Sequence, residues 1–279
     1  MKEIRRFQVR GIPGEVTRAD FAGRTVDFWA PEGGSDQVLV AHDGQNIFDP
    51  RTATHLRQTW KLTQTAIRVA KESNQKPPLV IGVFHSSNKA DPYGRVKDLT
   101  PEDIFKAGLQ PSNPIPNFDI SHLRGNKYLD QIFNEIIPTL SETTKTKYHP
   151  EMTAMLGSSM GGLSTLYAFA KHSDKFHTAL AFSTHWTIAG AELVDSLIGN
   201  LPAPNNRKLW MSRGTKGLDA AYDPFQIKAD ELVRQKGWHN NFVTKVYHRT
   251  GHNERSWSSY VDEAVRFWLG KPVNTNLRS

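Results

Sequence analysis

The segment best suited to chemistry is MTAMLGSSMGGLSTLYAFA, in which an apolar stretch runs into a glycine-rich turn and then a helical pattern. A G-x-S-x-G motif in that strand–turn–helix setting places a serine on a sharp turn, where it can act as the nucleophile of acyl transfer. The glycines fix the register, because Ser159 lies between Gly157 and Gly161 whereas Ser158 has larger residues at the same offsets. We therefore predict that Ser159 is the nucleophile; the alternative is a tight turn that carries an incidental serine.

A nucleophilic serine needs a base, and in this setting the acid and then the histidine follow it along the chain. His252 is the best candidate, because RTGHNERSW reads as a loop between the last predicted strand and the last helix. Such a loop lies at the carboxyl edge of the sheet, where α/β proteins bind ligands. His248 is the runner-up, but it continues the strand pattern FVTKVYH. The two histidines could also form a metal pair, yet Gly251 and the absence of a helical pattern between them oppose it, and we predict no metal site.

The acid should follow the strand KLWMS, in the loop RGTKGLDAAYDP, which offers Asp219 and Asp223. Asp223 has a structural role available, as the N-cap of a helix that starts at Pro224. Asp219 has no such role. We therefore predict that Asp219 orients His252 and stabilises the imidazolium that forms when the serine loses its proton.

Acyl transfer also needs hydrogen-bond donors for the oxyanion. One donor should be the Met160 N–H, directly after the nucleophile, and the second should come from the loop after an early strand, VLVAHDGQNIFDP. Gly44 permits a tight turn there that can aim the Gln45 amide into the site, and Asp43 and Gly44 are then expected to line the substrate site. The alternative is an ordinary Asp-Gly turn at the end of a strand.

The segment STHW follows another apolar run and contains two further candidates. His185 could line a pocket there. Trp186 could form a wall of the acyl or alcohol pocket, and we predict it as a substrate-binding residue, although a place in the hydrophobic core explains it equally well.

These residues require a sheet that brings the ends of several strands together. Apolar, β-branched runs alternate with helical patterns along the chain, which predicts an α/β protein with a mostly parallel sheet and helices on both faces. The first strands follow one another without a long helix and can be antiparallel. The strands that we expect are Phe7–Val9, Thr25–Trp29, Val38–Ala41, Leu79–Phe84, Met152–Leu156, Thr178–Phe182, Lys208–Met211 and Phe242–Tyr247.

Three helical patterns are clear between and after these strands. An apolar stripe predicts a helix over Leu129–Leu140, which Pro138 should kink or shorten in its last turn. A second helix follows Pro224, and the last one carries an apolar face from Trp257 to Trp268. The polar, Pro-rich stretch 86–126 differs, and we expect long loops with one short helix over the edge of the sheet. We interpret residues 1–279 as a single domain with this excursion.

Composition limits the remaining classes of function. The chain has no Cys, which excludes disulfides, thiolate metal sites and a thiol nucleophile. The net charge is +7, but Lys and Arg are scattered, which favours a solvated surface over nucleic-acid binding. No segment approaches the roughly 20 apolar residues of a membrane span. The start, MKEIRRFQVR, has no apolar run of a signal peptide, so we expect a cytoplasmic protein.

Taken together and in this order, HDGQNIFD, GSSMGG, GTKGLDAAYDPFQ and GHNERSW resemble the putative esterase family, the relatives of esterase D and the enterochelin esterases. The resemblance spans about Arg24 to Leu269 and implies an α/β-hydrolase fold without a cofactor. Members cleave feruloyl, acetyl, siderophore-lactone and thiol esters, and the related mycolyltransferases pass an acyl group to a sugar. The resemblance implies the triad Ser159, Asp219 and His252, with the amides of Gln45 and Met160 as the oxyanion hole.

Two departures limit what the resemblance implies. The S-formylglutathione hydrolases have a histidine where this chain has Ser158, and residues 88–117 match no substrate-specific pattern. The leading hypothesis is therefore hydrolysis of a small-molecule carboxylic ester through an acyl-enzyme. An acyltransferase that uses an alcohol or sugar acceptor is a close alternative. A non-catalytic binding module on a hydrolase fold is a different one, which the intact Ser, Asp and His set disfavours.

Overall fold

The computed structural model describes residues 1–112 and 119–270, and one nine-stranded sheet runs through them. The strands lie in the order β1-β2-β3-β5-β4-β6-β7-β8-β9. Their bounds are Lys2–Phe7 (β1), Val16–Phe21 (β2), Arg24–Trp29 (β3), Val38–His42 (β4), Leu79–Val83 (β5), Thr153–Ser158 (β6), Thr178–Phe182 (β7), Lys208–Lys216 (β8) and Phe242–Gly251 (β9).

The directions of the strands agree with the sequence-based expectation. The pairs β1–β2, β2–β3 and β3–β5 are antiparallel, and all pairs from β5 to β9 are parallel. The parallel strands therefore end at one edge of the sheet. This edge carries the loops that contain the predicted site residues.

Two details at the N-terminal end of the chain were predicted wrongly. The first strand is Lys2–Phe7 rather than Phe7–Val9, and β2 was not predicted at all. The sequence of β2, VTRADF, contains charged residues that interrupt the apolar pattern expected of a buried strand. Arg18 is compatible with a largely buried strand because its guanidinium donates two hydrogen bonds of 2.7 Å to Asp27 on β3.

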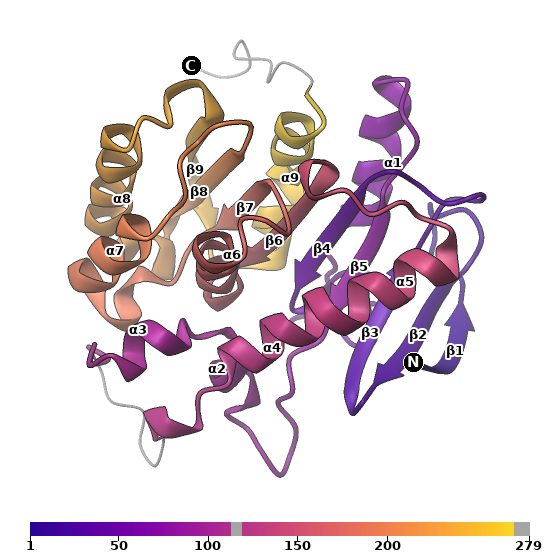
Figure 1. Ribbon diagram of the computed structural model, residues 1–279, viewed down its shortest axis with the longest axis horizontal. Helices are drawn as coiled ribbons and strands as arrows, with labels where there is room; N and C mark the ends of the chain where they lie inside the picture. The colour runs from indigo at the N-terminus through magenta and orange to yellow at the C-terminus, as the bar shows by residue number, and fades with distance from the viewer. Residues whose placement is uncertain (113–118, 271–279) are drawn as a thin grey trace.

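Helices cover both faces of the sheet, as Figure 1 shows, and alternate residues of the central strands face two separate cores. On β4, Val38 and Val40 pack on one side, and Leu39 and Ala41 pack on the other. The α/β prediction is confirmed. On the second side lie α1 (Leu62–Glu72) and α9 (Glu254–Trp268); on the first lie α4 (Gly125–Gln131), α5 (Ile137–Thr144), α6 (Met160–Lys171), α7 (Gly190–Gly199) and α8 (Asp223–Gln235).

The helix around Pro138 continues further than predicted. A π-helical segment, Ile132–Ile136, joins α4 to α5, and the helix then runs through Pro138 to Thr144. Proline lacks an N–H and its ring crowds the preceding turn, so an ordinary α-helix would break there. The wider π-helical turn directly before it lets the helix go on.

The excursion at 86–126 also differs from the expectation of loops with one short helix. It contains two short helices, α2 (Gly94–Leu99) and α3 (Glu102–Lys106), and a 3₁₀ turn; residues 113–118 lie outside the described part. Helix α2 packs against α4 and α6, and α3 packs against α7. The excursion therefore lies against the helices of one face rather than over an edge of the sheet.

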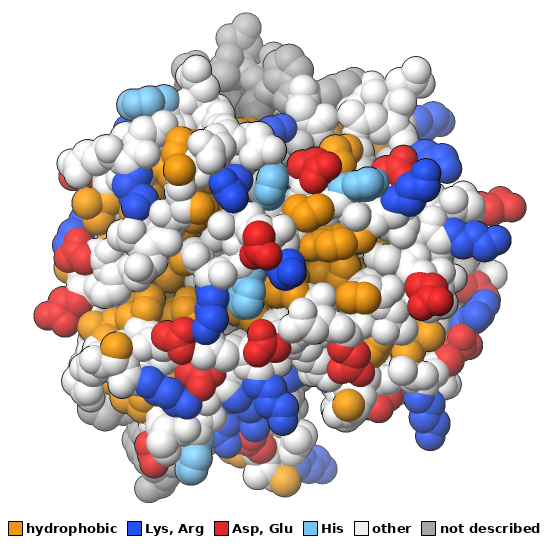
Figure 2. Space-filling model, viewed as in Figure 1, with side chains coloured by type: hydrophobic (Ala, Val, Ile, Leu, Met, Phe, Trp, Pro, Cys, Tyr) orange, Lys and Arg blue, Asp and Glu red, His pale blue; other side chains and the backbone are white. Residues whose placement is uncertain are grey.

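One face of the molecule is mixed in charge. Figure 2 shows acidic and basic side chains interspersed over the face that it presents, with apolar side chains between them. Among the described helices, none is long and apolar enough to cross a membrane.

A glycine-to-alanine pair tests how closely the loop after β4 approaches β5. A Cβ at Gly44 would lie 2.3 Å from the carbonyl of Gly82, whereas a Cβ at Gly199, in α7, meets nothing within 4 Å. We expect Gly44→Ala to lower the free energy of unfolding by about 1–3 kcal/mol, because backbone must shift. Gly199→Ala should leave it unchanged or raise it by up to about 1 kcal/mol. Urea unfolding measures both, and equal midpoints would contradict the close approach.

Candidate active site

Ser159 occupies the turn between β6 and α6, as the glycine spacing predicts. Its φ of 57° and ψ of −121° are strained for a non-glycine residue. A Cβ at Gly157 would lie 2.4 Å from the carbonyl of Gly161, so the backbones of the strand and the helix approach too closely for a side chain there. The Ser159 N–H donates a hydrogen bond of 2.9 Å to the Phe182 carbonyl, which ties the turn to β7.

His252 and Asp219 are paired, as predicted. The distance between Nδ1 of His252 and Oδ1 of Asp219 is 2.6 Å, and the carboxylate has no exposed surface. Its other oxygen accepts from the Ser183 hydroxyl at 2.8 Å and from the Gly214 N–H at 2.7 Å. An ionised carboxylate can only accept, so Nδ1 is the donor, and Nε2 of the neutral ring is left as a proton acceptor.

The His252 loop is held by the residues on either side of it. Asn253 caps α9, since its side chain accepts from the Ser256 N–H at 3.0 Å. Trp257 packs edge-on against His252 at 5.0 Å between ring centroids, and its indole N–H donates to Ser183 at 2.9 Å. Ser183 therefore connects the acid, the indole and, through its place after β7, the strand next to the serine turn.

Tyr222 lies beside His252 and His185 and was not singled out from the sequence. Its buried ring is 5.7 Å from the ring of His252, and its hydroxyl is 2.6 Å from Nδ1 of His185. Burial raises the pKa of Tyr222, while hydrogen-bonding interactions with Ser159 and Thr187 act in the opposite direction. The phenol of Tyr222 thus interacts with Ser159, His185 and His252, which lie at the same edge of the sheet.

His185 is neutral at physiological pH. Burial, together with the nearby His252 and the charge of Arg95, lowers the pKa of His185 to about 4. Its backbone N–H donates to the Ser159 carbonyl at 3.2 Å. The expectation that His185 could line a pocket therefore becomes more specific: it lies directly behind the serine turn.

The predicted oxyanion residues lie on neighbouring strand ends. Strand β4 pairs with β6, so the loop after β4 runs beside the serine turn, and a Cβ at Gly161 would lie 3.4 Å from Oδ2 of Asp43. The backbone of Asp43 adopts the left-handed conformation, with φ 53°, and Asp43 directly precedes the 3₁₀ turn Gly44–Asn46. The first N–H groups of a helix have no partner within it. The amides of Gln45 and of Met160, the first residue of α6, are therefore two donors from adjacent strand ends.

The carboxylate of Asp43 is engaged by another residue, which revises its predicted role. Arg95 of α2 donates to both of its oxygens, at 2.8 and 2.6 Å. Burial disfavours the Asp43 carboxylate, but the charge and hydrogen bonds of Arg95 outweigh it, and the pKa of Asp43 is lowered. The Asp43 carboxylate thus ties the excursion to the loop that follows β4, and its two oxygens are already engaged by Arg95.

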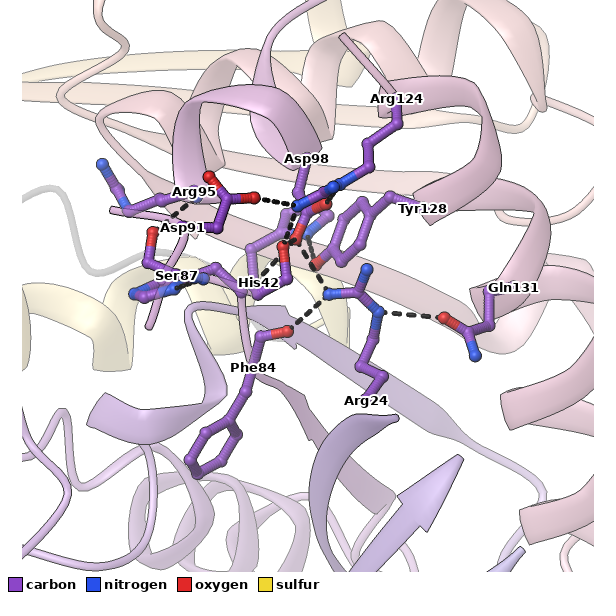
Figure 3. Close-up of polar contacts among 12 residues, drawn as sticks. Arg24, His42, Phe84, Ser87, Asp91, Arg95, Asp98, Arg124, Tyr128 and Gln131 are labelled. Carbon is purple, nitrogen blue, oxygen red and sulfur yellow. Dashed lines mark hydrogen bonds and ion pairs between the residues drawn. The ribbon is translucent and has the colours of Figure 1, made fainter. Parts of the chain in front are cut away.

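Figure 3 shows how the excursion is fastened further. The buried carboxylate of Asp98 accepts from Arg24 at 3.0 Å and from Arg124 at 2.9 Å. Arg24 also lies over the ring of Tyr128, whose hydroxyl is 2.7 Å from Nδ1 of His42 at the end of β4. Ion pairs and one aromatic ring therefore connect α2 and α4 with the strand that leads into the oxyanion loop.

A second contact connects the oxyanion loop with the histidine loop. The side-chain amide of Asn46 donates to Oε1 of Glu254 at 3.2 Å, and both residues are buried. Glu254 begins α9, two residues after His252. This buried hydrogen bond thus fixes the two loops relative to each other.

Two residues were interpreted wrongly from the sequence. Asp223 makes no capping hydrogen bond; it lies in the first turn of α8 and forms an ion pair with Arg213. The choice of Asp219 thus agrees with the geometry, although the argument that excluded Asp223 does not. Trp186 has no exposed surface and donates its indole N–H to Gln226 at 3.1 Å, so it is a core residue rather than a wall of a pocket.

His248, the second candidate for the base, is an exposed residue of β9, as its strand pattern predicts. It does not form part of a metal cluster either. Within residues 1–112 and 119–270, no group of three or more His, Asp or Glu could hold a metal ion.

Comparison with known proteins defines the class. Solved structures share this architecture, and the fold is the α/β-hydrolase fold. The enterobactin esterase FES from Shigella flexneri matches with a TM-score of 0.61 and 14% identity over 96% of this chain and 58% of that chain. The BES protein from Bacillus cereus matches with a TM-score of 0.60 and 16% identity over 95% of this chain and 99% of that chain.

The family follows from the sequence itself. Residues 24–269 match the family described as "Putative esterase", and the chain belongs to this family. The uncharacterized protein YbbA of Bacillus subtilis is 30% identical over 124 residues, which are 44% of this chain and 47% of that protein. The chain thus spans less than two thirds of the Shigella esterase, and its match to YbbA covers about half of that relative.

Removal of Arg95 tests the Asp43 ion pair through its pH dependence. The pKa of Asp43 is lowered, so the pair stabilises the protein above the unfolded-state pKa and the contribution is lost as the pH falls through the folded-state pKa. In Arg95→Met burial becomes the dominant influence on Asp43, and burial favours the protonated acid. We expect a loss of about 2–3 kcal/mol near neutral pH, less than for a fully buried pair because Arg95 is 30% exposed.

The loss should shrink when the pH is lowered from about 7 to about 4, because protonation of Asp43 removes the cost of a buried carboxylate without a cationic partner. Urea unfolding at the two pH values gives the measurement. Arg68→Met removes two surface ion pairs, with Glu72 and Asp262, as the control and should cost less than about 1 kcal/mol. An equal loss for Arg95→Met at both pH values would contradict the pair's role.

Proposed function

We propose that the protein is a serine esterase that hydrolyses a carboxylic ester through an acyl-enzyme at Ser159. The observation that carries the proposal is the hydrogen bond of 2.6 Å between His252 and the buried Asp219, together with a serine held on a strained turn at the same edge of the sheet. Membership of the esterase family supports it. So does the structural likeness to a Shigella protein described as an enterobactin esterase.

The reaction begins with transfer of the Ser159 proton to Nε2 of His252. The serine oxygen attacks the ester carbonyl, and Asp219 stabilises the imidazolium. The amides of Gln45 and Met160 donate to the oxyanion. His252 then gives the proton to the leaving alcohol, the acyl-enzyme forms, and water repeats the sequence to release the acid.

Tyr222 positions the nucleophile in this scheme. We propose that the neutral His185, with its proton on Nδ1, donates to the Tyr222 oxygen 2.6 Å away, and that the phenol donates in turn to the Ser159 oxygen as that oxygen loses its proton. That hydrogen bond leaves the serine proton free for His252. It also strengthens as negative charge develops on the serine oxygen, since hydrogen bonds to charged groups are the stronger ones.

Substitution of the proposed acid and nucleophile tests the assignment. We expect Ser159→Ala to abolish turnover of a p-nitrophenyl ester series. Asp219→Asn should lower kcat by about a thousandfold, because the histidine loses the partner that orients it. Asp223→Asn is the matched control and should stay within about threefold, because Asp223 is half-exposed and pairs only with Arg213. The reverse ranking of the two aspartates would refute the choice of acid.

A single hydroxyl tests the role of Tyr222. Tyr222→Phe should lower kcat by about 10- to 100-fold, the effect of one hydrogen bond to a charged group, with a smaller change in KM. Tyr148→Phe removes a half-buried hydroxyl that donates to the Lys175 carbonyl, and it should have no such effect. Thermal unfolding of both variants separates a catalytic loss from a structural one. A kcat of Tyr222→Phe within twofold of the native value would rule the role out.

A further inference from the structure

A groove of about 850 Å³ opens beside His252, between the turn after β8 and the loop that joins β9 to α9. It shares His252 with the proposed catalytic centre. The 11 residues that line it include no Asp or Glu. They include His252 and the cations Lys216, Arg249 and Arg255.

The cations of this groove differ from most arginines of the molecule. Lys216, Arg249 and Arg255 are exposed, and across the described residues no carboxylate lies within ion-pair distance of them. Among the described residues, the exposed Arg6, Arg51 and Arg68 pair with carboxylates, whereas the exposed Arg10, Arg57 and Arg234 form no ion pair. The distinguishing feature of the groove is therefore that three such cations line one concave surface.

The two carboxylates nearest along the chain cannot neutralise the groove. Asp219 is buried against His252, and Glu254 is buried against Asn46. The groove therefore carries three uncompensated positive charges, and the field of such a concave surface attracts anions.

The backbone of the groove is held in place by hydrogen bonds. Arg249 is a non-glycine residue with φ 64°, and its N–H donates to the Thr215 hydroxyl at 3.0 Å. The Gly251 N–H donates to the Ser256 hydroxyl at 3.1 Å, and Gly251 is paired with Lys216 in the sheet. A strained residue kept by its surroundings is a feature that gathers at binding sites.

We propose that this groove binds an anionic group, a carboxylate or a phosphate, on the alcohol portion of the ester. The inference rests on the proposed function, in which His252 returns a proton to the leaving alcohol. The alcohol portion must then lie next to His252, and the groove is one surface that His252 lines. Arginine suits the task because its planar fork matches carboxylate and phosphate oxygens. The enzyme is thus selective for esters whose leaving alcohol carries negative charge.

Three matched esters test the selectivity. 4-Acetoxybenzoate carries its charge on the alcohol portion, 4-acetoxybenzamide is neutral, and monophenyl succinate carries its charge on the acyl portion. The ratio of kcat/KM between the charged and the neutral acetates is measured for the native protein, Arg249→Gln and Arg255→Gln. Arg57→Gln, an exposed cation outside the groove, is the control.

We expect each groove variant to lower this ratio by about tenfold at low salt, mainly through KM, and added salt to lower the native ratio in the same way. Arg57→Gln should leave the ratio unchanged. A ratio that is unaffected by the groove variants, or equally affected by Arg57→Gln, would overturn the proposal. So would an equal effect of the groove variants on monophenyl succinate, because the charge would then be recognised regardless of its position.

A binding measurement separates this proposal from the catalytic one. In Ser159→Ala protein, calorimetric titration with 4-acetoxybenzoate should show binding that Arg249→Gln weakens about tenfold, whether or not the native protein turns the ester over. Equal affinities of the Ser159→Ala protein for 4-acetoxybenzoate with and without Arg249 would contradict only the proposal that the groove binds an anion. Undiminished turnover by Ser159→Ala would sink the proposed function alone.

Discussion

The site depends on how closely two backbones approach each other at the end of β6. The strand and α6 come so near that a Cβ at Gly157 would overlap the Gly161 carbonyl, and Ser159 is held at φ 57° between them. Such a conformation costs about 1–3 kcal/mol and persists only where its surroundings enforce it. The hydrogen bond from Ser159 to Phe182 and the sheet on both sides of β6 supply that enforcement. The parallel register then places the ends of β4, β7, β8 and β9 around the serine.

Polar contacts turn this set of strand ends into a fixed arrangement. Asp219 is bound to Ser183 as well as to His252, Asn46 is bound to Glu254, and Asp43 is bound to Arg95. Each contact joins loops that follow different strands, so the oxyanion, acid and histidine loops have little freedom relative to one another. Preorganised donors of this kind stabilise a developing charge without reorganising during the reaction. The cations beside His252, in contrast, have no carboxylate partner within the described part of the chain, which is the basis for the proposal that they bind an anionic ligand.

Much of this could be predicted from the sequence, and the exceptions have physical reasons. Buried parallel strands are continuous apolar runs, so the strands at 38–41, 79–84 and 178–182 were visible, as was the glycine-framed Ser159. Strand β2 was missed because Arg18 interrupts its apolar pattern and is paired with Asp27 across the sheet on β3, which no local pattern reveals. Arg95 was missed because its partner, Asp43, lies 52 residues away along the chain. Tyr222 was missed because a tyrosine, which has an apolar ring and a polar hydroxyl, suits a hydrophobic core and a binding site equally. The sequence around Trp186 was compatible with a pocket wall and with a core residue, and its complete burial shows that it is a core residue.

The central claim is that the oxygen of Ser159 is the atom that becomes acylated. Its most direct test is to react the protein with a serine-directed phosphonate and locate the adduct by peptide mass spectrometry. The account predicts one adduct per chain, on the peptide that contains Ser159, formed quickly by the native protein and far more slowly when His252 is replaced by alanine. An adduct on any other residue, or none at all in protein that hydrolyses esters, would contradict it.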